Sequence, residues 1–329
     1  MNRDDKDGWR PRRVLDPAEA RTLAARAFPR DRVLAAEPLH GGLRNTSIRV
    51  ALEGRAERSV LRLYDADPAA CGKEAALLSS LAPTVPVPEL LEARPLAADG
   101  LPPLLVLRYV EGITFRDLKN AGNAAATAQA AASVGATLAA IGHHRYPRAG
   151  RLEAGGKLGA PFVPGPDPFL RFFEHCLAMP ALQARMDVGL RERVAAYARA
   201  WAPRLRALDD DARLVHGDFG ATNILVHQVR GAWQVAAVID WEFALAGSPM
   251  FDLGHFLRYE RAARPVREPT FSQAYRDAGG ELPDDWRQVA RAVDLTALCD
   301  LLTRDEVPRE IVDEVTAMVE ASLAGRDAP

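Results

Sequence analysis

One stretch of the sequence places an acid, an amide and a second acid between apolar segments. Asp218 and Asn223 follow the apolar pair Leu214-Val215. Asp240 comes 17 residues after Asn223 and ends the apolar run 235–239. Such runs, bounded by polar residues, are typical of buried strands. Two strands that flank one loop would bring the three polar side chains together.

These three residue types are the ones that phosphoryl transfer to an alcohol requires. The reaction needs a carboxylate that orients the hydroxyl and accepts its proton, together with oxygen ligands that hold magnesium against the nucleotide phosphates. Magnesium prefers hard oxygen ligands and takes one or two carboxylates besides phosphates and water. Asp218, Asn223 and Asp240 supply these groups. The pattern therefore favours a magnesium-nucleotide phosphotransferase.

Other chemistries fit less well. His216 and Asp218 could ligate the metal of a hydrolase, but the other histidine cluster, His143-His144, has helix-end rather than metal spacing. The sequence has no G-x-S-x-G elbow of a serine hydrolase and no G-x-x-x-x-G-K-[ST] phosphate loop. An ordinary protein kinase would carry G-x-G-x-x-G, H-R-D and A-P-E, which this sequence lacks, and it has H-G-D and D-W-E in place of two of the kinase motifs.

The run His216-Gly217-Asp218 with Asn223, followed by Ile239-Asp240-Trp241, resembles the signature of the aminoglycoside phosphotransferase and choline kinase-like family. The resemblance implies an α+β, two-lobed protein-kinase-like fold. It makes Asp218 the catalytic base, and Asn223 and Asp240 the magnesium ligands. His216 would support the catalytic loop, as would Asp252, which stands in the family's D-L-G segment.

The resemblance extends to a nucleotide site in the first third of the chain. Its expected members are a glycine turn over the phosphates, a basic residue that contacts them, the acidic partner of that residue, and two residues near the adenine. These are Gly41, Gly42 and Asn45 for the turn, Arg62, Glu74, and Leu107 with Tyr109. Arg62 stands where typical kinases have Lys, and a guanidinium can also clamp phosphate oxygens.

The elements that position these residues divide the chain into two lobes. Residues 1–15 are expected to be a loose N-terminus, 16–110 the nucleotide-binding lobe and 111–329 the catalytic and acceptor-binding lobe. The first lobe should hold a small sheet with one helix packed on it, and the second should be mostly helical. Expected strands are 47–52, 59–64 and 104–110; expected helices are 16–27, 69–81, 124–141, 191–208, 286–302 and 311–323. Residues 150–168 are rich in Gly and Pro and predict a long surface loop.

The composition limits the kinds of binding partner and the cellular location that we expect. The net charge of −2 argues against nonspecific nucleic-acid binding, which needs an excess of Lys and Arg. No continuous run of about 18 apolar residues predicts a membrane span, and charges interrupt the N-terminus where a signal peptide would be apolar. We expect a cytoplasmic protein, monomeric or homodimeric. Its three cysteines, Cys71, Cys176 and Cys299, should be reduced packing residues.

The C-terminal segment suggests an acceptor. Residues 281–329 hold twelve acids against five arginines, a net −7. Asp294 and Asp300 fall on the apolar arc of the expected helix 286–302, so they face either an acceptor cleft or a structural salt bridge. Glu174 is a further candidate for acceptor binding.

Together these features predict transfer of the γ-phosphate of ATP, or GTP, to a hydroxyl of a small molecule. The first expectation is a cationic, aminoglycoside-like antibiotic. The alternatives are a metabolic kinase similar to choline, homoserine or fructosamine kinases, and a catalytically inactive nucleotide-binding scaffold.

Overall fold

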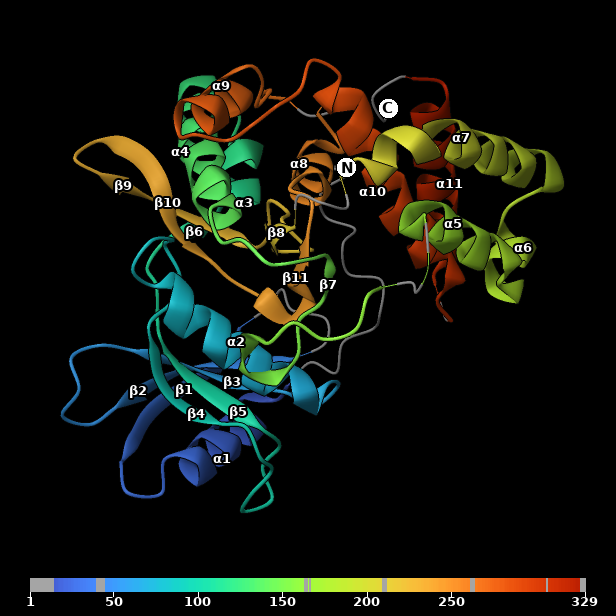
Figure 1. Ribbon diagram of the computed structural model, residues 1–329. Coiled ribbons are helices and arrows are strands. Elements are labelled where there is room, and N and C mark those ends of the chain that lie inside the picture. The colour runs from blue at the N-terminus through green and yellow to red at the C-terminus, as the bar shows by residue number, and fades with distance from the viewer. Residues whose placement is uncertain are drawn as a thin grey trace.

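The computed structural model describes residues 15–39, 45–162, 165, 167–208, 212–260, 264–305 and 307–325. A β-rich region formed by the first third of the chain lies below a larger, mostly helical region in Figure 1. This arrangement confirms the predicted α+β class. The expected glycine turn at Gly41 and Gly42 lies outside the described residues.

An antiparallel five-stranded sheet forms the β-rich region. Its order is β1-β2-β3-β5-β4, and neighbouring strands are antiparallel. The bounds are β1 Val33–Pro38, β2 Thr46–Leu52, β3 Ser59–Leu63, β4 Leu90–Arg94 and β5 Leu104–Arg108. The three predicted strands are β2, β3 and β5. The two edge strands, β1 and β4, were not predicted.

Helices cover both faces of this sheet, rather than the one face predicted. Side chains alternate along each strand. Leu104 and Val106 of β5 therefore pack with α1 (Pro17–Ala27), whereas Leu105 and Leu107 face the core that includes α2 (Pro68–Leu81). Asp16 caps α1 by accepting a hydrogen bond of 2.9 Å from the backbone N–H of Ala18, as predicted.

The helical region contains two packed groups. In the first, α4 packs against α9 and β10, and α8 packs against α10. In the second, α5, α6, α7, α10 and α11 enclose a separate apolar cluster. The bounds are α3 Phe115–Asn120, α4 Ala124–Gly142, α5 Pro168–Ala178, α6 Pro180–Arg185, α7 Val188–Arg206, α8 Met250–Leu257, α9 Thr270–Asp277, α10 Trp286–Thr303 and α11 Arg309–Leu323.

Two short sheets position the polar loop found in the sequence. The hairpin β9 (Ile224–Val229) and β10 (Ala232–Val238) pairs with β6 (Ile113–Thr114). A second sheet has the order β7 (Gly150–Arg151), β11 (Leu245–Gly247), β8 (Arg213–Val215). The chain leaves the five-stranded sheet after β5 and enters the next one at β6, so the change of lobe falls between residues 108 and 113.

Helix α4 is long and apolar enough to cross a membrane, the one such helix in the described part of the chain. This run was overlooked in the sequence, where Thr, Gln and Ser interrupt it. One such helix is weak support for a membrane span, because buried core helices pass the same test. Here it packs against α9 and β10.

Residues 150–160, called the strap below, lie at the surface as predicted, with most of them exposed, but local contacts hold them in place. They begin in β7, which pairs with β11, and continue through a short 3-10 turn, η2 (Ala154–Gly156). The turn rests on α2 of the other lobe. Gly72 of α2 lies so close that a Cβ there would be 3.5 Å from the Cβ of Ala154. The strap therefore connects the helical region to α2.

Candidate active site

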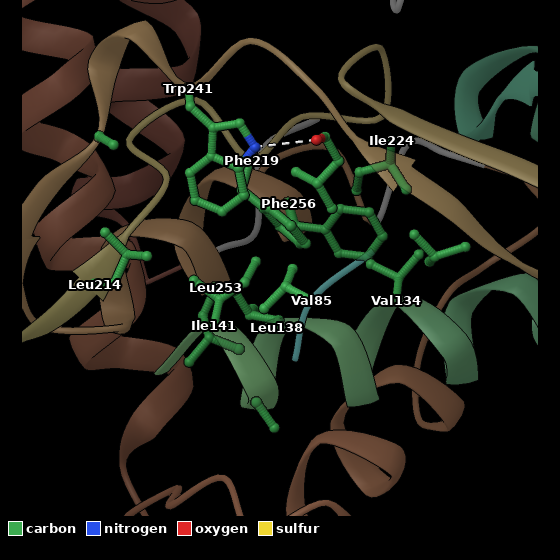
Figure 2. Packing of buried hydrophobic residues seen from close by; sticks show 14 of the residues in the cluster. Val85, Val134, Leu138, Ile141, Leu214, Phe219, Ile224, Trp241, Leu253 and Phe256 are labelled. Carbon is green, nitrogen blue, oxygen red and sulfur yellow. Dashed lines mark hydrogen bonds between the residues drawn. The ribbon is translucent and has the colours of Figure 1, made fainter. Parts of the chain in front are cut away.

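Asp218, the predicted base, and Asp240, a predicted metal ligand, are each followed by a buried aromatic residue. Phe219 follows Asp218, and Trp241 follows Asp240; both rings are fully buried in the same apolar cluster. Figure 2 shows them with Phe256 and Leu253 of α8, and with the indole N–H of Trp241 donating to the carbonyl of Val238 at 3.0 Å. Packing of this core thereby fixes the backbone that carries both carboxylates.

Asp218 and Asn223 are joined directly. The Asn223 amide donates to the Asp218 Oδ2 at 2.8 Å and to its backbone carbonyl at 2.9 Å. The backbone carbonyl of Asn223 accepts from Ile239 N at 2.9 Å, which places Asn223 beside the end of β10 and therefore beside Asp240. The structure thus brings together the three residues that the sequence pattern selected.

His216 holds the catalytic loop from inside. Its Nε2 lies 2.9 Å from the carbonyl of Ile239, and its Nδ1 accepts from the backbone N–H of Asp218 at 3.2 Å. This pairing requires the neutral tautomer with a proton on Nε2. Burial lowers the pKa of His216 to about 4, so the ring is neutral at physiological pH.

Asp252 fixes the same loop from α8. Its two carboxylate oxygens accept from the backbone N–H groups of His216 and Gly217, at 2.7 and 3.0 Å. Burial raises the pKa of Asp252 to about 7, although both N–H groups favour its charged form. Gly217 has φ of 80°, and a Cβ there would lie 2.5 Å from the carbonyl oxygen of Phe243. Only glycine fits that turn.

Asp240 connects the helical region to the sheet. Its backbone is in the left-handed region, with φ of 67°, which turns the chain sharply after β10. Its carboxylate is hydrogen-bonded to Arg62 of β3, whose Nε lies 3.4 Å from Glu74 of α2. Burial disfavours the charge of Arg62, but Asp240 and Glu74 outweigh it and the pKa of Arg62 is raised well above its usual value. Tyr64 donates to Glu74 at 2.6 Å.

Glu242 is a site residue that the sequence interpretation missed. Its carboxylate accepts from the Asn45 amide at 2.9 Å, and its backbone carbonyl accepts from Lys73. Asn45, which was expected near the nucleotide, and Lys73, which was not, are therefore both bound to the segment that follows Asp240. A signal for this role was present in the sequence, because Glu242 lies only two positions from a predicted metal ligand.

The two residues expected near the adenine are placed differently from each other. Leu107 is buried in the core on the α2 side of the sheet. The ring of Tyr109 lies between the guanidinium groups of Arg49 and Arg58, at 5.4 and 4.9 Å from its centroid. Cation–π contacts of this kind hold the ring at the end of β5. Contact of either residue with a nucleotide stays a prediction.

His255 of α8 is the second residue that was missed. Its Nε2 lies 3.5 Å from Oδ1 of Asp218, and the side chain is buried but for a fifth of its surface. Burial, with Arg258, His216 and Arg267 nearby, lowers the pKa of His255 well below its usual value. It follows Asp252 by three positions, which places both side chains on one face of α8.

The predicted acceptor acids do not form one surface. Asp294 is buried and accepts hydrogen bonds from Nη2 and Nε of Arg258, at 2.6 and 2.8 Å, so the structural salt bridge is the alternative that holds. Asp300 is exposed and pairs with Arg304 one turn later on α10. Glu174 is exposed on α5. The helical period placed Asp294 on the inner face correctly, but Arg258, rather than an acceptor, lies opposite.

The acidic C-terminal segment is partly neutralised within the fold. Five of its acids form ion pairs with arginines, four of which lie earlier in the chain. The pairs are Glu281–Arg213, Asp285–Arg204, Asp294–Arg258, Asp300–Arg304 and Glu320–Arg193. The net −7 of this segment is therefore partly offset within the fold, at five of its twelve acids.

Comparison with known proteins accounts for this arrangement. The family model described as "Phosphotransferase enzyme family" matches residues 35–292, which include Arg62, Glu74 and the segment from His216 to His255. The chain belongs to the phosphotransferase enzyme family. The predicted recognition of this family is thereby confirmed.

Solved structures of this family share the fold. Aminoglycoside phosphotransferase APH(4)-Ia superposes with a TM-score of 0.71 at 18% identity, covering 92% of this chain and 97% of that one. Wild-type aminoglycoside 2'-phosphotransferase-IIIa, in its GDP complex, superposes with a TM-score of 0.68 at 17% identity, covering 94% and 99%. These matches confirm the two-lobed kinase-like fold.

Curated relatives match a short part of this chain. Acyl-CoA dehydrogenase family member 11 of Pongo abelii is 36% identical over 76 residues, which are 23% of this chain and 9% of that protein. The Homo sapiens protein of the same name is 44% identical over 48 residues, 15% and 6% of the two chains. The matched segment thus spans less than a tenth of either relative.

Proposed function

We propose that this member of the phosphotransferase family transfers the γ-phosphate of ATP to a hydroxyl of a small molecule. The observation that carries the proposal is the cluster of Asp218, Asn223 and Asp240 at the base of one hairpin, with Arg62 reaching Asp240 from the other lobe. Solved relatives with the same fold support it: one carries ADP with hygromycin B, and another carries GDP with kanamycin.

Asp218 would act as the base. Its side chain is exposed over 39% of its surface, more than any other member of the cluster, so an acceptor can reach it. The acceptor oxygen bonds to the γ-phosphorus, and the bond from that phosphorus to the bridging oxygen of ADP breaks. The hydroxyl proton passes to Asp218. Asn223, donating to Oδ2, holds the carboxylate in place during this step.

The residues fit a magnesium ion. The Asn223 amide nitrogen is committed to Asp218, which turns its carbonyl oxygen toward the remaining space, and Asp240 offers a carboxylate. Such an oxygen pair, completed by phosphates and water, is what magnesium prefers. When bound, the ion would neutralise charge on the nucleotide phosphates. Arg62 would then be shared between Asp240, Glu74 and phosphate oxygens.

The range of acceptors that we propose is wider than cationic antibiotics. An aminoglycoside-like acceptor is supported by the folds of the solved relatives, but five of the twelve acids in the segment that suggested a cation, Asp294 and Asp300 among them, are paired with arginines. We therefore include uncharged and anionic hydroxyl compounds among the candidates. Transfer of the label from γ-labelled ATP, measured on a panel of aminoglycosides, amino alcohols, sugars and hydroxylated acids, would rank these acceptors.

Substitution of the two acids tests the reaction. Asp218→Asn should lower transfer at least about a hundredfold, since positioned proton transfer contributes that much, while magnesium-dependent nucleotide binding is kept. Asp240→Asn should weaken that binding itself. Calorimetry with AMP-PNP, with and without magnesium, and label transfer would measure the two effects. Asp277→Asn, on an exposed turn of α9, is the control.

Each alternative gives a distinct result. Full turnover in Asp218→Asn would contradict the role of the base. Nucleotide binding without transfer to any acceptor or to water would favour the inactive scaffold. Hydrolysis of a phosphate ester without nucleotide binding would favour the metal-dependent hydrolase.

A further inference from the structure

His255 is a buried polar group beside the catalytic loop for which the family signature gives no role here. Its Nε2 lies 3.5 Å from Oδ1 of Asp218, the oxygen that does not receive the Asn223 amide. The carboxylate therefore has a different nitrogen facing each of its oxygens. That distance is slightly longer than an ordinary hydrogen bond, and catalytic contacts of this kind commonly tighten when substrate binds.

The fold leaves His255 little freedom. A Cβ on Gly220 would lie 3.3 Å from Nε2 and 3.7 Å from Cδ2 of the imidazole, so the ring packs against the backbone of the catalytic loop. On the same helix, Asp252 accepts hydrogen bonds from that loop. Arg258 anchors the helix to Asp294. The ring is thus held between two elements that are themselves fixed.

The charges around His255 favour its neutral form. Arg258 lies on α8, His216 on the catalytic loop and Arg267 on the segment before α9, and all three oppose a positive imidazole. Asp218 is the acidic group that faces it at 3.5 Å. A neutral ring can still donate through Nε2. Its contact with Asp218 is then not an ion pair, which would lower the basicity of the carboxylate, but one that a small further approach converts into a hydrogen bond.

We propose that His255 is a positioning residue, which donates from Nε2 to Oδ1 of Asp218 and sets the plane of the carboxylate toward the acceptor hydroxyl. The inference rests on the proposed function, since it assumes that Asp218 is the base. With Asn223 on one oxygen and His255 on the other, rotation about the last side-chain bond of Asp218 is restricted.

Two variants of similar size separate donation from packing. His255→Gln keeps an N–H at comparable reach, and His255→Leu removes it. We expect His255→Leu to lower kcat about tenfold. Misplacing a catalytic group by about 1 Å can cost on the order of a hundredfold, and Asn223 still holds the other oxygen of Asp218 in this variant. His255→Gln should stay within about threefold of the wild type. KM for ATP should change less than about threefold in both variants.

A third variant moves the ring without removing it. Gly220→Ala forces the imidazole back by a few tenths of an ångström and should lower kcat by a few-fold. His143→Leu, at an exposed histidine that ends α4, is the control. Turnover is followed as release of labelled phosphate from magnesium-ATP with water as the acceptor. Equal kcat for His255→Leu and wild type would overturn the proposal.

The effect of removing His255 in an Asp218 variant distinguishes the role of His255 from the proposed function of the site. In an Asp218→Asn background, His255→Leu should cause no additional loss, because its effect passes through the carboxylate. Fast turnover by Asp218→Asn alone would instead contradict the proposed function. Slow turnover by Asp218→Asn with normal turnover by His255→Leu would contradict only the role of His255.

A measurement that needs no turnover completes the test. Nitrogen-15 NMR of the imidazole, assigned by its loss in His255→Gln, should show a neutral ring protonated on Nε2 at pH 7.5. The Nε2 signal should shift in Asp218→Asn. A cationic ring, or a proton on Nδ1 alone, would rule out the donor.

Discussion

At the scale of single residues, the site depends on histidines that are kept neutral. His216 accepts from the backbone of Asp218 through Nδ1, which a protonated imidazole could not do. The sequence motif identified His216 as a support residue but could not reveal which nitrogen accepts, since that depends on the carbonyl of Ile239, 23 residues away. Burial of the ring then has a consequence for acid stability.

His216 should make the folded protein sensitive to mild acid. Its pKa falls from the ordinary 6.5 to about 4 on folding, so the unfolded chain binds more protons between these values. Stability contributed by the neutral ring is present above pH 6.5 and is lost as the pH falls toward 4, by up to about 3 kcal/mol. Chemical denaturation at several pH values should show this loss in the wild type.

The comparison variant for this prediction is His216→Gln, which cannot titrate. The difference between the two unfolding free energies isolates His216 from other titrating groups, including Asp252, whose raised pKa acts in the opposite direction. A difference that does not vary between pH 6.5 and 4 would contradict the prediction.

At the scale of elements, α8 gathers the supports of the catalytic loop. Asp252, His255 and Arg258 follow at intervals of three and therefore share a face. Asp252 and His255 meet the loop, while Arg258 pairs with Asp294 of α10. Close packing accompanies the pair, because a Cβ on Gly254 would lie 2.4 Å from the carbonyl oxygen of Ala290. Asp294 thus supports catalysis through α8.

Removal of Asp294 should lower stability rather than acceptor affinity. Asp294→Asn leaves Arg258 buried with a neutral partner, and breaking a buried pair costs about 3 kcal/mol. Asp300→Asn, on the same helix but exposed, should cost less than about 1 kcal/mol. Thermal and denaturant unfolding would measure both. A raised KM for the acceptor with unchanged stability in Asp294→Asn would restore the acceptor-binding interpretation.

The elements also show what the sequence could predict. Strands β2, β3 and β5, and helices α2, α4, α7, α10 and α11, follow from local periodicity because each buries a regular face. The edge strands β1 and β4 were missed because exposure on one side weakens the apolar alternation. Partners distant in sequence, such as Arg258 for Asp294, leave no periodic signal. The proximity of Asp218, Asn223 and Asp240 could be predicted because all three lie at the two ends of one hairpin, and their roles stay predictions.

At the scale of the whole molecule, the two lobes meet through polar contacts that include Arg62 and Asn45, two residues proposed for the nucleotide site. Arg62 binds Asp240, Asn45 binds the carboxylate of Glu242, and Lys73 binds its carbonyl. The strap adds a contact from the helical region to α2, the helix that carries Lys73 and Glu74. Placement of α2 therefore decides whether these residues can meet the segment after Asp240.

A bulky residue at Gly72 should weaken nucleotide binding from a distance. Gly72→Leu would push the strap off α2, because the Cβ alone already comes within 3.5 Å of Ala154. We expect KM for ATP to rise several-fold with a smaller change in kcat. Gly72→Ala is the matched control, since it makes an ordinary contact and favours the helix. Equal KM values for the two variants would contradict the role of the strap.

The strap also limits how the lobes can move. The connection between β5 and β6 joins them at one place, the strap on α2 at a second, and a hydrogen bond of 2.8 Å from the backbone N–H of Val238 to the carbonyl of Pro86 at a third. A body attached at one point can turn about three axes, and each further attachment removes some of that freedom. Opening for nucleotide exchange should therefore be a small movement, after which Arg62 and Asp240 return to the same register.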